Sequence, residues 1–347
     1  MTKSIVVVGA GVVGLTCAYQ LAEEGYDVTI VAKHLPSTSI ADSQYTSPWA
    51  GAHFRPFPAK TPEEYRDSKL TRSTFQVFKR LAATFPESSI RFMPGTDFIE
   101  RNDPMYENVS AGYAEGIENF KVLPKSSLPD GVKFGATYNA WCMNSPMYIQ
   151  FLERRLEMYY KVKFMQESLG SLQQVAKLFP GATIVNCSGR GLTYYGGYDP
   201  ATYPIRGQTL LVKSPKDCPY NSETVTYQLE DGSFCFVIPR PLDGGVILGG
   251  TKQVGDLYSQ VRDADTQKLI ENGKKRFPEL LIDGEFQIKR INVGFRPARH
   301  GGVRIEREVV DGTEVVHCYG FGGSGYEMSW GAGQKVVELV KSAKSKL

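Results

Sequence analysis

The stretch Ser4-Ile5-Val6-Val7-Val8-Gly9-Ala10-Gly11-Val12-Val13-Gly14-Leu15 joins a β-branched run to a helical pattern through Gly-x-Gly-x-x-Gly. This order is typical of a dinucleotide-binding βαβ unit. Gly9 permits the tight turn, Gly11 lets the backbone approach a pyrophosphate, and Gly14 lets the helix pack closely against the strand. The amides at the N-terminus of the helix, including those of Val12 and Val13, are then placed to hold the diphosphate. The sequence therefore predicts that a nucleotide cofactor organises the fold.

The second strand of this unit, over 26–32, ends without the acidic residue that usually binds the adenosine ribose. The chain has Ala32-Lys33-His34 at this place. Lys33 is therefore the candidate contact to ribose or phosphate. The missing carboxylate weakens the interpretation of this unit as an NAD site.

The composition is that of an ordinary globular protein. The chain has 347 residues, a formal net charge of +3, 22% charged and 41% hydrophobic residues. This length allows two domains with a substantial core. No apolar run approaches the roughly 18 residues that a membrane-spanning helix needs. Neither nucleic acid nor a membrane is expected as a partner.

The cysteines and histidines show no metal-ligand spacing. The six cysteines are scattered without a Cys-x-x-Cys pair, and most lie in apolar contexts. We therefore expect buried free thiols rather than disulfides, and no metal site.

The chain ends in Ser345-Lys346-Leu347. A terminal Ser-Lys-Leu is an address read by the peroxisomal import receptor. The sequence thus predicts a peroxisomal matrix protein, in a compartment that houses oxidases releasing hydrogen peroxide.

The remaining periodicity indicates two interleaved domains. Helical patterns occur over 61–85, 146–160, 263–277 and 329–345, and strand-like runs over 183–189, 209–212, 234–238, 245–248 and 315–320. The runs 183–189 and 315–320 both lead into glycine turns, as expected for further strands that point at the nucleotide. We predict an α/β (α+β) fold in which a nucleotide-binding domain (1–60, 140–200 and 295–347) is interleaved with a substrate domain (61–139 and 201–294).

Five separated segments point to one family. They are Gly9-x-Gly11-x-x-Gly14, Ser47-Pro48-Trp49-Ala50-Gly51-Ala52, Ile205-Arg206-Gly207-Gln208, Gly294-Phe295-Arg296-Pro297-Ala298-Arg299 and Tyr319-Gly320-Phe321-Gly322-Gly323-Ser324-Gly325-Tyr326. In this order and spacing, over essentially the full length, the chain resembles the D-amino-acid oxidase and D-aspartate oxidase family, particularly its fungal members. The resemblance implies an FAD enzyme with a Rossmann-like nucleotide domain and an antiparallel sheet over the flavin.

The resemblance also implies the reaction. A D-amino acid gives a hydride from Cα directly to flavin N5, and molecular oxygen then takes the electrons and leaves as hydrogen peroxide. The imino acid hydrolyses to a 2-oxo acid and ammonia. Such a reaction needs no side-chain nucleophile, so positioning of the substrate dominates catalysis.

The resemblance assigns the substrate-binding residues. Arg296 matches the arginine that clamps the α-carboxylate, a task suited to a planar guanidinium. Phe236 stands where the family usually has a tyrosine, so that Tyr227 or Tyr258 is left as a possible source of the missing hydroxyl. Gly323 leaves space near the substrate amine. Lys252, which replaces an aromatic residue of the neutral-substrate enzymes, and His53, which replaces Asn and lies near Arg55, favour an acidic substrate.

The remaining candidates concern FAD. Lys33 replaces the ribose acid, Leu169 offers backbone contacts to the adenine, and Glu327 is expected to point away from the reduced flavin. Arg304 is either a flavin-site residue or an ion-pair partner of Glu306 or Glu308. The full set of expected FAD contacts is Gly9, Gly11, Val12, Val13, Gly14, Lys33, Thr46, Ala50, Gly51, Leu169, Gly322, Gly323, Gly325, Tyr326 and Glu327.

The favoured interpretation is oxidation of D-aspartate or D-glutamate. The alternatives are an oxidase that prefers neutral D-amino acids and, more remotely, an amine oxidase acting on glycine or sarcosine, an NAD-dependent dehydrogenase or a non-catalytic flavin-binding protein. The sequence leaves the oligomeric state open.

Overall fold

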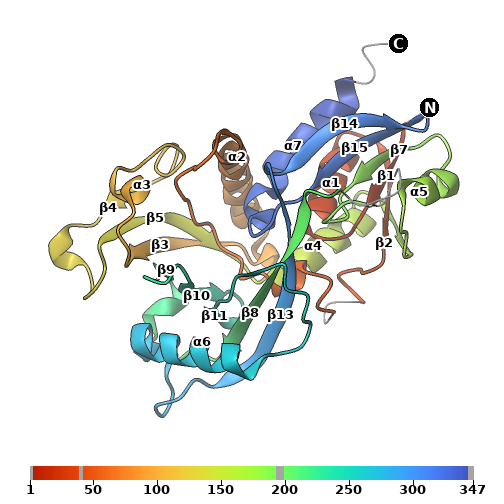
Figure 1. Cartoon of the computed structure of the whole chain (residues 1–347). Coiled ribbons are helices and arrows are strands. Elements are labelled where there is room, and N and C mark those ends of the chain that lie inside the picture. Colours follow the sequence, from red (N-terminus) through yellow and green to blue (C-terminus); the bar gives the residue numbers. More distant parts are fainter. Residues whose placement is uncertain (1–2, 39–41, 193–198, 343–347) are drawn as a thin grey trace.

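The computed structural model describes residues 3–38, 42–192 and 199–342, and it contains two sheets that lie side by side (Figure 1). The first sheet has the strand order β14-β15-β7-β1-β2-β6. All neighbours in it are parallel except the hairpin of β14 and β15. Its strands are β1 (Ser4–Val8), β2 (Asp27–Ala32), β6 (Lys163–Gln166), β7 (Thr183–Asn186), β14 (Arg304–Val310) and β15 (Thr313–Tyr319).

Helices cover both faces of the first sheet. Side chains alternate between the two faces along each strand, and both faces of its central strands are apolar and must be buried. Ile5 and Val7 of β1 belong to the core under α1 and α7, whereas Val6 and Val8 pack with residues of α5 on the other side. Helix α2 crosses α7 so closely that a Cβ on Gly331 would lie 2.5 Å from the Leu70 carbonyl oxygen. The helices are α1 (Val12–Glu23), α2 (Pro62–Thr84), α4 (Ser145–Met158), α5 (Leu172–Leu178) and α7 (Gly325–Ser342).

The second sheet has the order β12-β8-β11-β10-β9-β3-β5-β4, with β13 along the other edge of β8. Helix α6 (Asp263–Arg276) packs on one face of it through Leu269, and the opposite face looks towards the first sheet. A short helix, α3 (Pro104–Glu107), lies between β3 and β4 in the chain. The strands are β3 (Arg91–Ile99), β4 (Lys121–Val122), β5 (Phe134–Cys142), β8 (Thr202–Val212), β9 (Thr224–Gln228), β10 (Phe234–Arg240), β11 (Gly245–Gly249), β12 (Gln253–Val254) and β13 (Ile288–Arg299).

Strand β13 connects the two sheets. It pairs with β8 along its length, and its end bridges to Phe321 through Ala298. The Gly322 amide donates a hydrogen bond of 2.8 Å to the Pro297 carbonyl oxygen. The glycine loop after β15 is therefore fixed directly to the strand that carries Arg296.

The predicted α/β fold with an interleaved antiparallel sheet is confirmed. The closing helix begins at Gly325, earlier than the expected 329, because the glycine loop leads into it without a spacer. The domain boundaries remain a prediction. Two of them fall inside strands, since β5 runs to Cys142 and β13 to Arg299.

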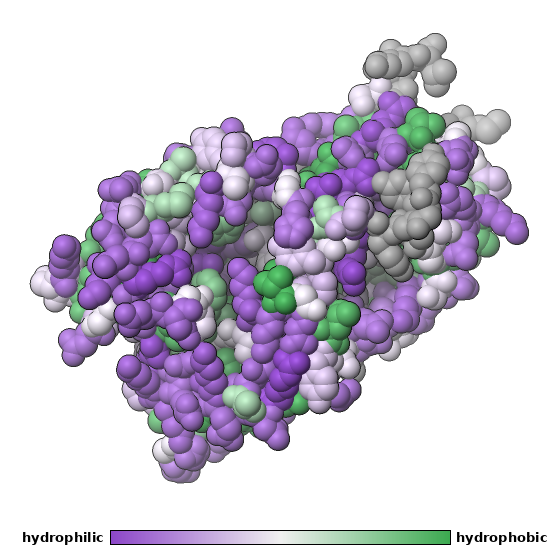
Figure 2. Space-filling model, in the orientation of Figure 1, coloured by the Kyte–Doolittle hydropathy of each residue, from purple (hydrophilic) through white to green (hydrophobic). Residues whose placement is uncertain are grey.

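The exterior is mainly hydrophilic on the face shown in Figure 2, where apolar residues form small, separated groups. Among the described residues, no helix has the length and apolar character required to cross a bilayer. All six cysteines are buried and free, as the sequence predicts.

Candidate active site

One long cavity of about 570 Å³ lies between the two sheets. It begins at the carboxyl ends of the parallel strands β1, β2 and β7, where open α/β sheets bind ligands. It ends against the inner face of the second sheet. There, period-2 alternation turns one set of side chains inwards from each strand. These are Gly207 and Thr209 of β8, Phe236 and Ile238 of β10, Ile247 of β11, and Asn292, Gly294 and Arg296 of β13.

The glycine turn after β1 forms one end of this cavity. Gly9 has φ 105°, and a Cβ there would lie 2.5 Å from the Cys187 carbonyl oxygen. A Cβ on Gly14 would lie 1.9 Å from the Gly9 carbonyl oxygen, so Gly14 brings the helix onto the turn without lining the cavity itself. The Val12 amide donates to Ser47 Oγ at 3.0 Å. Bare backbone at a helix N-terminus fits a diphosphate, as the sequence predicts.

Gly9→Ala is expected to yield protein that has lost most of its bound FAD, because the added methyl group collides with rigid backbone. Flavin absorbance per protein chain measures this loss. Gly25→Ala is the matched control, since Gly25 also has positive φ (82°) but nothing within 4 Å of the added Cβ. Gly25→Ala should cost about 1 kcal/mol of stability and leave the flavin content unchanged. Equal flavin loss in both variants would contradict the assignment of the turn.

The adenosine end of the cavity has Lys33 and Leu169 in its lining. Lys33 Nζ donates to Gln44 Oε1 at 3.1 Å, and both residues line the cavity. Sequence reasoning missed Gln44, as well as Glu167 and Ser168 beside Leu169. No local sequence pattern marked these three residues.

The middle of the cavity is walled by two backbone segments. One is the turn around Ala50 and Gly51, whose carbonyl oxygens accept hydrogen bonds from the buried guanidinium of Arg240 at 2.7 and 3.1 Å. The other is the glycine loop before α7, where Tyr326 Oη donates to the Ser47 carbonyl at 2.9 Å. Sequence reasoning missed Arg240, because nothing local to Pro239-Arg240 reveals a partner some 190 residues away. Thr46, Gly322, Gly323 and Gly325 also line this region.

Glu327 is a buried acid in the cavity wall. Its Oε1 accepts the Arg55 amide proton at 2.7 Å. Desolvation raises the pKa of Glu327 to about 7, although the Arg55 hydrogen bond and the charges of Arg55 and Arg72 oppose the shift. That Glu327 points away from the flavin remains a prediction.

Glu327→Gln should stabilise the protein more as the pH rises. An acid whose folded pKa lies above its unfolded value of about 4.5 destabilises the native state progressively up to about pH 7 and constantly above it. At about 1.4 kcal/mol per pKa unit, the variant should gain about 3–4 kcal/mol over the wild type above neutrality, and almost nothing near pH 4.5. Urea unfolding of both proteins across this range provides the measurement. A pH-independent difference between the two proteins would be inconsistent with the buried acid.

Arg296 forms the floor of the substrate end. Its guanidinium lies flat on Gly207, where a Cβ would come within 2.5 Å of Nη1. Nη1 donates to the Thr251 carbonyl oxygen at 3.2 Å. Desolvation lowers the pKa of Arg296, but an arginine remains a cation at neutral pH. Gly323 lies close to this side chain, since a Cβ on Gly323 would be 3.8 Å from Arg296 Cδ. A glycine there leaves space beside the guanidinium.

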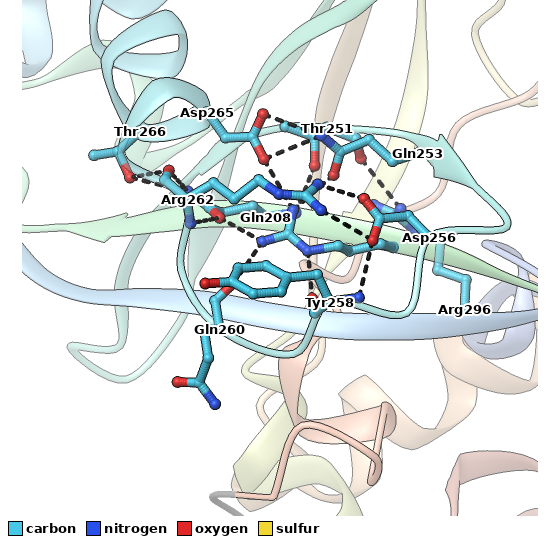
Figure 3. A network of polar contacts seen from close by, with 11 residues as sticks. Gln208, Thr251, Gln253, Asp256, Tyr258, Gln260, Arg262, Asp265, Thr266 and Arg296 are labelled. Atoms are coloured by element: carbon cyan, nitrogen blue, oxygen red, sulfur yellow. Dashed lines mark hydrogen bonds and ion pairs between the residues drawn. The ribbon is translucent and has the colours of Figure 1, made fainter.

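A polar network behind Arg296 holds Thr251 in place (Figure 3). The Gln208 amide donates to Thr251 Oγ1 at 2.7 Å, and the Thr251 amide donates to the Gln208 carbonyl at 3.1 Å. Arg206 is fully buried and donates to the Tyr258 and Gln260 carbonyls and to Asp265 Oδ2. The network therefore anchors the segment 251–262 to β8, and with it the acceptor that orients the Arg296 guanidinium.

His53 and Phe236 make the neighbouring wall. Their rings lie 6.4 Å apart and are stacked. His53 Nδ1 is 2.6 Å from Thr224 Oγ1. Desolvation, followed by the charge of Arg55, lowers the pKa of His53 to about 3, so this imidazole is neutral at physiological pH. The expectation that His53 adds a positive charge is therefore not supported.

Neither of the two tyrosines left open by the sequence lines the cavity. Tyr227 packs on Phe98 and Phe277 in the core under α6. The exposed ring of Tyr258 lies against the Arg262 guanidinium instead.

Arg55 lines the cavity as a cation. Its Nη1 is buried and has no hydrogen-bond partner within the described part of the chain. Desolvation is the largest influence and disfavours the charge, but the groups of Asp97, Tyr106, Tyr138 and Glu327 together outweigh it, so the pKa of Arg55 is raised. Asp97 is fully buried, and neither of its oxygens has a hydrogen-bond partner among the described residues. Desolvation raises the pKa of Asp97 to about 6, opposed by Arg55.

Lys252 lies beside this cavity rather than in its lining. The residue is solvent-exposed. Partial desolvation lowers its pKa, and the cations Arg296 and Arg55 lower it further. Its ammonium group forms no ion pair or hydrogen bond with the residues that the structure describes. Arg304, left open by the sequence, does not line the cavity and pairs with Glu306 and Glu308.

The cavity thus brings together all the predicted site residues except Gly14 and Lys252. It joins a turn of the dinucleotide-binding type, a glycine-walled middle and a cationic pocket, an arrangement that indicates a nucleotide-dependent enzyme. The family model of FAD-dependent oxidoreductases matches residues 4–339. The chain therefore belongs to the FAD-dependent oxidoreductases.

Curated relatives narrow this assignment. The chain is 37% identical to a D-aspartate oxidase of Talaromyces thermophilus, over 98% of this chain and 95% of that one. It is 35% identical to a D-amino-acid oxidase of Schizosaccharomyces pombe, over 97% and 96% of the two chains. Within the FAD-dependent oxidoreductases, the chain is a member of the D-amino-acid oxidase and D-aspartate oxidase family.

Solved structures share the fold. A glycine oxidase from Bacillus cereus superimposes with a TM-score of 0.72 at 18% identity, over 99% of this chain and 96% of that one. An L-α-glycerophosphate oxidase from Mycoplasma pneumoniae with bound FAD gives a TM-score of 0.70 at 17% identity, over 98% and 95%.

Proposed function

We propose that this protein oxidises acidic D-amino acids, D-aspartate or D-glutamate, to the 2-oxo acid, ammonia and hydrogen peroxide. The observation that carries the proposal is Arg55. This cation lines the substrate end of the cavity, and its buried Nη1 has no acceptor among the residues that the structure describes. A buried, unsatisfied donor is costly, and a ligand carboxylate removes that cost.

The charges at the substrate end support a dicarboxylate. Arg296 is suited to the α-carboxylate, since its guanidinium is oriented by Thr251 and lies flat on Gly207. Arg55 is then the candidate partner of the side-chain carboxylate, and Lys252 adds positive potential at the exposed edge. A neutral side chain would leave Arg55 without its acceptor, and such sites discriminate strongly against ligands that lack the polar group.

FAD, when bound, supplies the two-electron acceptor. The protein's own residues bind, orient and shield the substrate. Phe236 and the neutral ring of His53 form an uncharged wall, which limits water and strengthens the ion pairs to the two arginines. The fixed link between β13 and the glycine loop holds the substrate clamp at a constant position relative to the cofactor site.

Peroxide release from purified holoenzyme with D-Asp, D-Glu, D-Ala and D-Met tests this proposal. We expect kcat/KM for D-Asp or D-Glu to exceed that for D-Ala by at least ~10²-fold. D-Ala or D-Met as the best substrate would favour the neutral alternative.

We also propose a peroxisomal matrix location, on the Ser345-Lys346-Leu347 terminus alone. These residues lie outside the described part of the structure. A fluorescent protein fused to the N-terminus should colocalise with a peroxisomal marker. Removal of the last three residues should disperse it. An unchanged distribution after that deletion would reject the address.

A further inference from the structure

A cluster of three buried thiols lies under the nucleotide-binding turn. Cys17 comes from α1, Cys187 follows β7, and Cys318 belongs to β15. Their three sulfur atoms all lie within 4.8 Å of one another, and Cys17 Sγ and Cys318 Sγ are 3.9 Å apart. Among the described residues, no histidine, aspartate or glutamate joins this thiol cluster.

The sulfur spacing suits a metal ion at the centre of the cluster. Metal–sulfur bonds of about 2.3 Å around a three-coordinate ion place the sulfurs about 4.0 Å apart. The observed 3.9 Å meets this requirement for one pair, and small side-chain rotations bring in the third sulfur. We propose that the thiol cluster is a binding site for a soft, thiophilic cation of the Cu(I), Ag(I) and Hg(II) class.

The donor set selects the class of metal. Three sulfurs without oxygen or nitrogen donors favour soft cations, whereas zinc in structural sites takes four ligands. Cysteines bind such cations as thiolates, so binding has to release thiol protons and should strengthen with pH.

The cofactor cavity provides the entry path. Cys187 and Cys318 line it, whereas Cys17 is completely buried behind them. The Cys187 carbonyl lies against Gly9, and its amide donates to the Val8 carbonyl at 2.9 Å. Any movement of Cys187 towards a metal therefore shifts the turn that faces the FAD diphosphate. The metal and FAD should bind antagonistically, and the metal site is consequently an inhibitory one.

Ag⁺ added to holoenzyme in chloride-free buffer tests this inference. Wild-type protein should retain one Ag⁺ per chain through gel filtration and release FAD in step, seen as the rise in fluorescence of free flavin. Cys17→Ser and Cys318→Ser should retain at least tenfold less Ag⁺, and Cys17→Ser, which does not line the cofactor cavity, should keep its FAD. Cys142→Ser and Cys235→Ser are matched controls, since both thiols are buried outside the cluster, and they should behave as wild type.

Two outcomes would overturn the inference. One is Ag⁺ retention in the cluster variants equal to that in the controls. The other is flavin release without bound Ag⁺. X-ray absorption of silver in wild-type protein gives a readout that does not depend on the folding of any variant, and it should show three sulfur neighbours. None of these measurements uses turnover, so they stand apart from the test of substrate preference.

Discussion

Arg296→Leu should lower kcat/KM by ~10²–10³-fold for every D-amino acid tested, while the protein keeps its full complement of FAD. Truncating one member of a buried, hydrogen-bonded charge pair costs about 2–5 kcal/mol. The guanidinium sits on Gly207 at the floor of the substrate end, and among the described residues Arg55 is the one other arginine in the cavity lining. The loss should therefore fall on binding of the α-carboxylate, which all substrates share. Steady-state kinetics with D-Asp and D-Ala measure it.

Arg296→Lys refines this test. A lysine keeps the charge but cannot bind a carboxylate with two parallel hydrogen bonds. It should therefore recover only part of the lost kcat/KM. Near-normal kinetics in Arg296→Leu, with the flavin in place, would remove Arg296 from the site and with it the proposed arrangement of the substrate.

Arg55→Gln should change which substrate is preferred. We expect the ratio of kcat/KM for D-Asp to that for D-Ala to fall by ~10²-fold, because only the acidic side chain loses its partner. The rate with D-Ala should stay within a few-fold. Glutamine keeps the length and polarity of the side chain and the Arg55 amide still donates to Glu327. A uniform loss for both substrates would instead indicate a structural role for Arg55, as the counter-ion of buried Asp97.

Lys252→Gln is the companion variant to Arg55→Gln. Lys252 is exposed, so its attraction for a dicarboxylate is screened by water and salt. The Lys252→Gln substitution should lower the ratio of kcat/KM for D-Asp to that for D-Ala several-fold at low ionic strength, and this effect should fade as salt is added. The Arg55 effect should persist in salt.

The sequence predicts well those parts of the molecule that depend on patterns of consecutive residues. The Gly9–Gly14 turn, the alternation along the strands and the arginine of β13 each carry their signal in consecutive residues. The charge state of His53 was beyond the sequence, because it depends on burial against Thr224 and on the field of Arg55. The same holds for the exposure of Lys252. The thiol cluster joins residues 17, 187 and 318, which come together only when helix α1 packs on the neighbouring strands β7 and β15.

Strand β13 has a consequence for how this enzyme can change over evolutionary time. A single strand bears the substrate clamp and is bonded to the glycine loop beside the cofactor. Substitutions along it therefore tend to trade new selectivity against flavin geometry. Arg55 and Lys252 lie on other segments of the chain. Substitutions at these two positions can therefore change the preference among D-amino acids with little effect on the geometry of the cofactor site.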